Sequence, residues 1–188
     1  MIKPFIQTLE QVAPLSDGLK KAFKKSFKQV VIKKGEILLS EGEVCSNAYF
    51  MVKGLARLYY LIKGKEVTNR FILPKSVAIS YYSFFSQKPS FEYIDVLCDS
   101  TALVISKQEM DKIYLDFPEL HKIMQGMLQQ SHIESEERAM ILRKLSAKEK
   151  YSIMRARFPA VFNNASTEQI ATFLGVTRET LSRIRSGK

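Results

Sequence analysis

The chain is poor in the residues that build metal centres and disulfide frameworks. It has two cysteines, Cys45 and Cys98, and two histidines, His121 and His132, among 188 residues. Two cysteines without a CxxC spacing are too few for a disulfide framework and do not predict a zinc or iron–sulfur site. We therefore expect two buried thiols and no bound metal.

Long apolar runs are missing as well. No segment approaches the roughly 20 apolar residues that cross a bilayer, and the N-terminus, which begins Met1–Pro4, has no apolar signal core. We therefore expect a soluble, cytoplasmic protein without a membrane partner.

Acidic residues are in deficit. The chain has 19 Asp and Glu against 29 Lys and Arg, a net charge of +10 and a pI near 9.6. A membrane surface or a nucleic acid would attract such a charge. From Arg143 to Lys188 there are ten Lys or Arg and three Asp or Glu, so +7 of the net charge lies in the last quarter.

The segment Ser166–Ser186 in this basic quarter predicts two short helices joined by a tight turn. Ser166 and Gln169 have the spacing of a capping box, Gly175 can end the first helix in a left-handed conformation, and Thr177 can cap the second. The residues expected to face inward at helical spacing are Ile170, Phe173, Leu174, Leu181 and Ile184. This pattern predicts a helix-turn-helix.

Four polar residues face outward at the start of the second helix: Arg178, Glu179, Ser182 and Arg183. A helix in the major groove reads bases from its N-terminal residues, where Arg can contact guanine and Glu can accept from the cytosine amino group. The alternative is an ordinary helical hairpin with a charged solvent face. The local excess of positive charge favours DNA.

The N-terminal region predicts two amphipathic helices. The first covers Ile2–Val12 and ends at Pro14, and the second is capped by Ser16 and reaches Phe27. The second helix is coated with lysines, which we interpret as a solvated face.

From Gln29 to Ser106 short β-rich runs alternate with turns. The expected strands are Val30–Lys33, Ile37–Ser40, Tyr49–Val52, Ala56–Leu61, Val67–Leu73, Val77–Ser80, Tyr93–Leu97 and Ala102–Ile105. Eight short strands without helices between them predict an antiparallel barrel or jelly roll. Barrels of this kind often hold a small molecule.

A capping box at Ser106 and Glu109 predicts a short helix over Lys107–Leu115. The following segment, Glu119–Arg143, has few breaking residues and predicts a rod of roughly 37 Å at 1.5 Å per residue. Such a rod is too long to be buried against one small barrel, so we expect it to pair with a second copy. The alternative is a single helix packed on its own barrel.

The last predicted unit contains three helices. Ser146 and Glu149 form a third capping box, which opens a helix that Pro159 ends. A loop at Asn163–Ala165 then leads to the helix-turn-helix.

The order of helix, β-barrel, long helix and helix-turn-helix resembles the catabolite activator and fumarate–nitrate regulator (Crp/Fnr) superfamily of bacterial transcription factors. Lys34–Gly54 is similar to the family's cyclic-nucleotide-binding barrel, and Ile170–Ile184 is similar to its recognition segment nearly residue by residue. The resemblance implies an α+β fold with a jelly-roll sensor domain over 1–116, a dimerisation helix over 117–144 and a DNA-binding domain over 145–188.

The resemblance also implies roles for single residues. Arg178, Glu179 and Arg183 become base-reading positions, with Ser182 as an addition. Thr177, Thr167 and Lys188 complete the expected DNA-binding set. The expected partners are double-stranded DNA with an inverted-repeat site, a second copy of the chain, and RNA polymerase.

The chain departs from the family in the cassette that holds the cyclic phosphate. Members that bind cyclic AMP use a Gly-Glu-x-Gly turn and a following Arg-Ser, whereas this chain has Ile79–Tyr82 and then Ser90–Phe91. Without the glycines the backbone cannot approach a phosphate closely, and without the arginine its charge is not neutralised. We therefore expect no cyclic AMP and leave the effector open. The candidate pocket residues are Ser80, Tyr81, Tyr82, Ser83, Ser90 and Phe91.

Two alternatives remain for this pocket. It can hold a less charged ligand, or the rings of Tyr81, Tyr82, Phe84 and Phe91 can fill it.

The leading hypothesis is a homodimeric, sequence-specific transcription regulator. A rival is a small-molecule sensor whose basic C-terminal domain binds nucleic acid non-specifically. An enzyme has little support, because both histidines lie on the long helix and a metal centre in the barrel would lack imidazole ligands.

Overall fold

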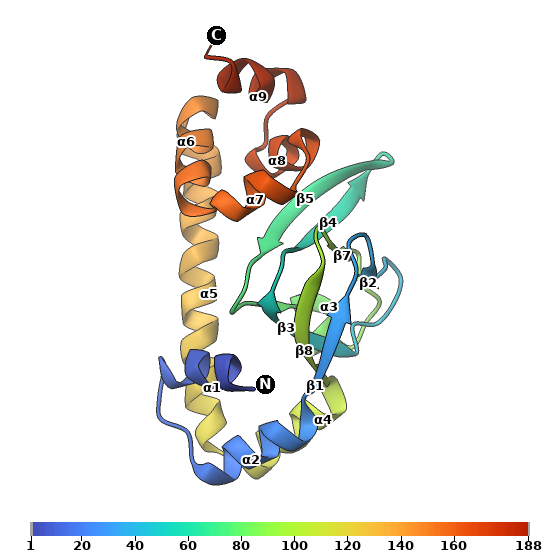
Figure 1. Ribbon diagram of the computed structural model, residues 1–188, viewed down its shortest axis with the longest axis vertical. Helices are drawn as coiled ribbons and strands as arrows, with labels where there is room; N and C mark the ends of the chain where they lie inside the picture. Colours follow the sequence, from blue (N-terminus) through green and yellow to red (C-terminus); the bar gives the residue numbers. More distant parts are fainter. Residues whose placement is uncertain (1, 188) are drawn as a thin grey trace.

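The computed structural model describes residues 2–187 and contains two four-stranded antiparallel sheets flanked by helices (Figure 1). One sheet has the order β1-β8-β3-β6 and the other β2-β7-β4-β5, which is a jelly roll. The strands are β1 Lys28–Ile32, β2 Ile37–Leu39, β3 Asn47–Lys53, β4 Ala56–Ile62, β5 Lys65–Ile72, β6 Val77–Ala78, β7 Tyr93–Val96 and β8 Ser100–Ser106. All eight predicted strands form, each ending within two residues of its predicted limits.

The main core lies between the sheets and under the N-terminal helices, α1 (Lys3–Glu10) and α2 (Asp17–Ser26). The ring of Phe5 contacts the rings of Phe23, Phe27 and Phe50, at centroid distances of 5.0, 4.6 and 5.2 Å. These helices therefore close one end of the barrel. The second helix ends before its predicted limit because Phe27 is already extended and leads into β1.

The helix α4 (Lys107–Asp116) forms where it was expected, but the capping box at its start does not. Ser106 Oγ accepts from the Glu109 backbone N–H at 3.2 Å. The Glu109 carboxylate instead accepts from Ser26 Oγ at 3.0 Å and pairs with Lys112. Glu109 therefore connects α4 to α2, and its carboxylate does not accept the Ser106 backbone N–H that would complete the capping box.

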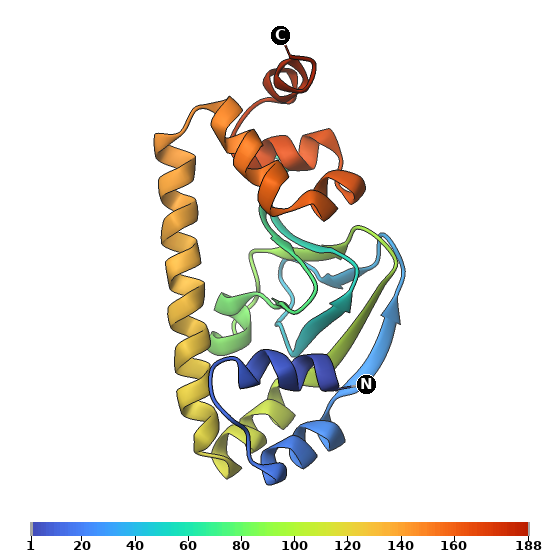
Figure 2. The same cartoon turned by 60° about the vertical axis from the view of Figure 1, so that its left-hand side comes forward.

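The long helix α5 (Glu119–Lys144) has two different halves. Its N-terminal half packs on the barrel core through the buried residues Leu120 and Ile123. A Cβ at Gly126 would lie 2.6 Å from Cγ1 of Val12, so this glycine permits the close approach of the chain after α1. The C-terminal half runs on beside the upper helices (Figure 2). No helix among residues 2–187 is long and apolar enough to cross a membrane.

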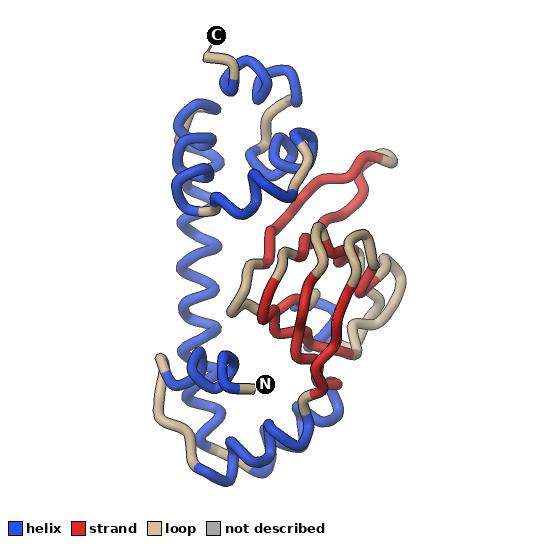
Figure 3. The backbone as a smooth tube through the Cα atoms, in the orientation of Figure 1, coloured by secondary structure: helices blue, strands red, loops and turns tan. Residues whose placement is uncertain are grey.

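Among residues 2–187 four helices, not three, follow α5, and Figure 3 shows them gathered at one end of the molecule, where strands β4 and β5 reach up beside them. They are α6 (Ala147–Arg157), α7 (Pro159–Asn164), α8 (Thr167–Leu174) and α9 (Arg178–Arg185). The predicted loop at Asn163–Ala165 was wrong for Asn163 and Asn164, which close α7, and right for Ala165. Pro159 begins α7 as well as following the end of α6. Proline suits the first helical position, since its fixed φ is helical and its missing N–H would have no partner there.

The core of these helices reaches into the barrel. Tyr151, Val161, Ile170 and Leu181 share one apolar cluster with residues of the sheets. The barrel residues of this cluster are Phe71 of β5, Leu55 just before β4 and Leu97 just after β7. The C-terminal helices therefore pack against the barrel.

Candidate nucleic-acid interface and sensor cassette

Local hydrogen bonds determine the geometry of the turn between α8 and α9. Ser166 and Gln169 form a complete capping box at the start of α8. Gly175 takes a left-handed conformation, with φ 65° and ψ 37°, and its N–H donates to the end of α8. Thr177 Oγ1 then accepts from the Thr180 N–H at 3.2 Å. The two helices are therefore held at a defined angle without a flexible linker.

The helix α9 has one buried and one exposed face. Leu181 is fully buried and Ile184 half-buried against α8 and α6. The four predicted base-reading residues, Arg178, Glu179, Ser182 and Arg183, are all exposed and line one shallow surface hollow together with Ser186. None of the four makes an ion pair within the described part of the chain. The charges of Arg178, Glu179 and Arg183 are thus available to an external partner.

The carboxylate of Glu179 is held in its charged form. Its own backbone N–H and the Thr177 hydroxyl, helped by the charges of Arg178 and Arg183, place the pKa of Glu179 below its usual value. A charged carboxylate can only accept hydrogen bonds.

The other predicted DNA-binding residues have different environments. Thr177 is exposed at the N-cap of α9. Thr167, at the start of α8, accepts from the guanidinium of Arg185 at 3.1 Å and is half-buried. Lys188 lies outside the described residues.

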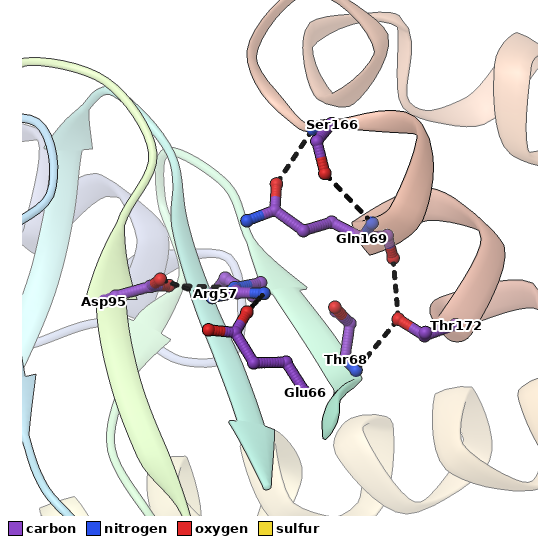
Figure 4. A network of polar contacts seen from close by, with 7 residues as sticks. All are labelled: Arg57, Glu66, Thr68, Asp95, Ser166, Gln169 and Thr172. Atoms are coloured by element: carbon purple, nitrogen blue, oxygen red, sulfur yellow. Dashed lines mark hydrogen bonds and ion pairs between the residues drawn. The ribbon is translucent and has the colours of Figure 1, made fainter. Parts of the chain in front are cut away.

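The helix α8 is anchored to strand β5 (Figure 4). The backbone N–H of Thr68 donates to Oγ1 of Thr172 at 3.2 Å, and the rings of Phe71 and Phe173 lie 5.0 Å apart. The barrel therefore takes part in positioning the α8–α9 pair.

The cassette between β6 and β7 contains a helix that the sequence analysis did not predict. Ser80 caps this helix, α3 (Tyr81–Ser86), by accepting from the Ser83 N–H. Its sequence is aromatic and short, so it has neither the length nor the polar face of a typical amphipathic helix.

The three predicted pocket serines, Ser80, Ser83 and Ser90, are buried and already occupied by internal hydrogen bonds. Ser80 Oγ donates to the Glu92 carboxylate at 2.8 Å, and Ser83 Oγ accepts from the Cys45 N–H at 2.8 Å. Ser90 Oγ donates to the Glu92 carbonyl at 2.9 Å. These hydroxyls therefore connect parts of the cassette to one another and to the backbone of Cys45.

The aromatic residues of the cassette do not fill an interior pocket. Tyr81, Tyr82 and Phe91 are 37%, 46% and 53% exposed, and only Phe84 is buried. The alternative in which all four rings occupy the pocket was therefore wrong. The buried residues of α3 are Ser83 and Phe84, whereas the two tyrosines at its start lie at the surface.

Two polar clusters were missed by the sequence analysis. Arg57 of β4, 2% exposed, is bound by the carboxylates of Asp95 and Glu66 (Figure 4). Its guanidinium also stacks on the Tyr59 ring at 4.0 Å. The second cluster surrounds Asn69 of β5 and is described below. A polar residue within a strand gives no periodic signal of burial, so sequence alone could not identify either cluster.

The cysteines form no disulfide. Cys45 is buried as expected, and burial raises the pKa of its thiol. Cys98 is only partly buried, because it lies in the turn between β7 and β8. Cys45 also lines a hollow of about 500 Å³ beside β2 and β3.

Comparison with known proteins gives the same architecture. Residues 29–117, just under half of the chain, match the family described as cyclic nucleotide-binding domain. A transcriptional regulator of the Crp/Fnr family from Eubacterium rectale is 16% identical, with 92% of this chain and 83% of that chain covered and a TM-score of 0.73. FixK2 from Bradyrhizobium japonicum is 20% identical over 86% of this chain and 83% of its own, with a TM-score of 0.72.

The catabolite activator protein of Thermus thermophilus is a further structural neighbour. It is 15% identical, with 96% of this chain and 85% of that chain covered and a TM-score of 0.58. No curated protein matches the chain by sequence. Residues 29–117 are therefore similar to the cyclic nucleotide-binding domain family, and the chain as a whole has the fold of the Crp/Fnr transcription regulators.

Proposed function

We propose that the protein is a homodimeric, sequence-specific DNA-binding transcription regulator of the Crp/Fnr type. In this proposal 1–116 is the sensor domain, 117–144 the dimerisation helix and 145–188 the DNA-binding domain. The α8–α9 pair is its helix-turn-helix, and α9 enters the major groove. The observation that carries the proposal is the exposed face of α9, where two arginines and one charged carboxylate have no internal ion-pair partners among the described residues.

The positions of these residues on the helix suit base readout. Arg178 and Glu179 are adjacent, and Arg183 lies five residues after Arg178, which is about 140° around the helix at 100° per residue. A helix in the groove can therefore direct the two arginines to different base pairs, with Glu179 between them. By resemblance to the family we expect a half-site with a TGA core, guanines contacted by the arginines and a cytosine amino group contacted by Glu179.

The proposed dimer forms through the helix Glu119–Arg143, which corresponds to α5. Leu128, Ile133 and Met140 of this helix are 47%, 54% and 50% exposed. Ile133 and Met140 are seven residues apart and therefore lie on one side of the helix, and a contiguous exposed apolar surface is typical of an interaction site. A two-fold dimer would place two copies of α9 about 34 Å apart, so its sites would be inverted repeats.

Selection of binding sites from random DNA tests this function. We expect an inverted repeat whose half-sites are separated by about one helical turn. The rival function is a sensor with a non-specific basic domain. In that case binding would fall steeply with salt and would select no consensus, because phosphate contacts carry the salt dependence and base contacts the preference.

We further propose that the cassette does not bind cyclic AMP. The hydroxyls of Ser80, Ser83 and Ser90 are used internally, and the buried Glu92 carboxylate would repel the phosphate. Calorimetric titration with cyclic AMP and cyclic GMP should give no heat of binding. Micromolar binding of either nucleotide would contradict this reading of the cassette.

A further inference from the structure

A chain of side-chain contacts joins the cassette to the α8–α9 pair through one residue of β5. Strand β4 pairs with β5 through Leu58 with Arg70 and Tyr59 with Thr68, so Asn69 is the extra residue of a β-bulge. Bulges redirect side chains, and they are frequent next to functional sites. Here the bulge directs the Asn69 amide to neighbours on two other elements.

The two ends of the Asn69 amide contact groups of opposite charge. Asn69 Nδ2 donates to Oε1 of Glu92 at 3.0 Å, and Asn69 Oδ1 accepts from the Arg138 guanidinium of α5 at 3.4 Å. The reverse orientation would point the amide NH₂ at the guanidinium, where it has no acceptor. The orientation of the amide therefore depends on both neighbours at once.

The contacts continue beyond these three residues in both directions. On the cassette side, the second oxygen of Glu92 accepts from Ser80, the N-cap of α3, at 2.8 Å. On the other side, the Arg138 guanidinium lies over the Phe173 ring of α8 at 4.3 Å. We call Ser80, Glu92, Asn69, Arg138 and Phe173 the Asn69 relay.

Arg138 is an unusual residue for a purely structural contact. It makes no ion pair within residues 2–187, and its Nε is buried without a hydrogen-bond partner. Burial lowers the pKa of Arg138 to about 10. Arg138 as a whole is half-buried, and within the described residues its guanidinium is held by one amide and one ring, so loss of the amide contact should release it.

We propose that the Asn69 relay transmits the conformation of the cassette to the α8–α9 pair. A change at Ser80 or Glu92 reorients the Asn69 amide, Arg138 loses its acceptor, and the Phe173 face of α8 loosens from the barrel. The relay goes beyond the proposed function, and its test measures the protein alone, without DNA. Failure of either idea can therefore be recognised separately.

Amide hydrogen exchange of the full chain, read in peptides that cover α8, tests the relay. Asn69→Ala should raise exchange in α8 about three- to tenfold, since a single hydrogen bond is typically worth that factor. Ser80→Ala should do the same although Ser80 does not contact α8. The matched control is Ser106→Ala, which removes the N-cap serine of α4 in the same barrel without touching the relay.

The outcomes are distinct. Faster exchange in α8 with Ser80→Ala but not with Ser106→Ala supports the relay. Unchanged exchange in α8 with Ser80→Ala, or an equal rise with both serine variants, overturns it. If Ser80→Ala does not fold, Glu92→Gln gives the same readout, because it keeps the size of the side chain and removes one acceptor oxygen.

A second measurement separates a relay from independent weakening. Arg138→Met keeps an unbranched side chain over Phe173 and removes the guanidinium. In this background, Ser80→Ala should add no further exchange in α8, because effects along one path are not additive. Full additivity of the two substitutions would overturn the proposal.

Discussion

At the scale of single residues, the exposed charged side chains of α9 support recognition of DNA bases by a small number of contacts. Arg178, Glu179 and Arg183 lie on the outward face, while Leu181 and Ile184 anchor the helix from the other side. Substitution of an outward residue should therefore change DNA recognition without changing the fold.

Arg183→Ala should lose preference at one base position of the selected site, since a bidentate contact is worth about 1–3 kcal/mol of discrimination. Lys188→Ala should instead weaken all sequences alike and reduce the salt slope by about one unit, as expected for a phosphate contact. Binding-site selection with both variants checks this assignment. An unchanged consensus for Arg183→Ala, with only weaker binding, would make Arg183 a phosphate contact.

The residues that the sequence could not reveal are those whose role depends on neighbours distant in the chain. Arg178 and Glu179 could be predicted because helical periodicity alone places them opposite the apolar positions. Asn69 and Arg138 could not, because 69 residues separate them and a bulge in β5 brings them together. Nothing in the local sequence marks that bulge.

At the scale of elements, the predictions succeeded where the turn and capping residues agreed with the apolar periodicity. The turn at Gly175 is an example, because the glycine, its φ of 65° and the capping residues on both sides specify the same geometry. The helices α3 and α7 were missed since each has six residues, too few to show an apolar stripe, and Pro159 both ends one helix and begins the next.

Gly175→Ala should destabilise the protein by about 1–2 kcal/mol, because the left-handed conformation brings an added Cβ against its own backbone. No other atom lies within 4 Å of that Cβ, so the cost is purely conformational. Gly175→Asn should cost less, since asparagine tolerates this region. Urea unfolding of both variants measures the difference, and equal losses would mean that the turn relaxes to a different conformation.

The capping box of α6 should make part of the stability pH-dependent. The Ser146 hydroxyl and then its backbone N–H donate to the Glu149 carboxylate, which lowers the pKa of Glu149 below the unfolded value of 4.5. A lowered pKa in the folded state contributes stability above the unfolded pKa. This contribution is therefore lost as the pH falls from 4.5 through the lower folded value.

Glu149→Gln should keep the cap and remove this pH dependence, because Gln169 completes the equivalent box with Ser166 in α8. We expect the melting temperature of the variant to fall less than that of the parent between about pH 6 and about pH 4. Thermal unfolding followed by circular dichroism checks this. Identical falls for the two proteins would show that the Glu149 contacts do not persist in solution.

At the scale of the whole molecule, the long helix connects the two ends of the protein. Its N-terminal half is covered by α1 and the barrel, and its C-terminal half reaches Arg138 and the relay. An association of two copies along that second half would therefore border the contacts that seat α8 on the barrel. In the proposed regulator, the dimer contact and the contacts that position α8 and α9 therefore lie next to each other on α5.

The dimer itself is tested by placing a charge on the exposed apolar face of α5. Ile133→Glu should convert the protein to a monomer, because a carboxylate buried between two helices without a partner costs more than the apolar contact contributes. Leu115→Glu is the matched control, since Leu115 is exposed and apolar but lies on α4. Sedimentation at micromolar concentration should give a dimer for the parent and the Leu115 variant. A monomeric parent would remove the dimer from the proposed function, and a dimeric Ile133→Glu would move the interface away from this face of α5.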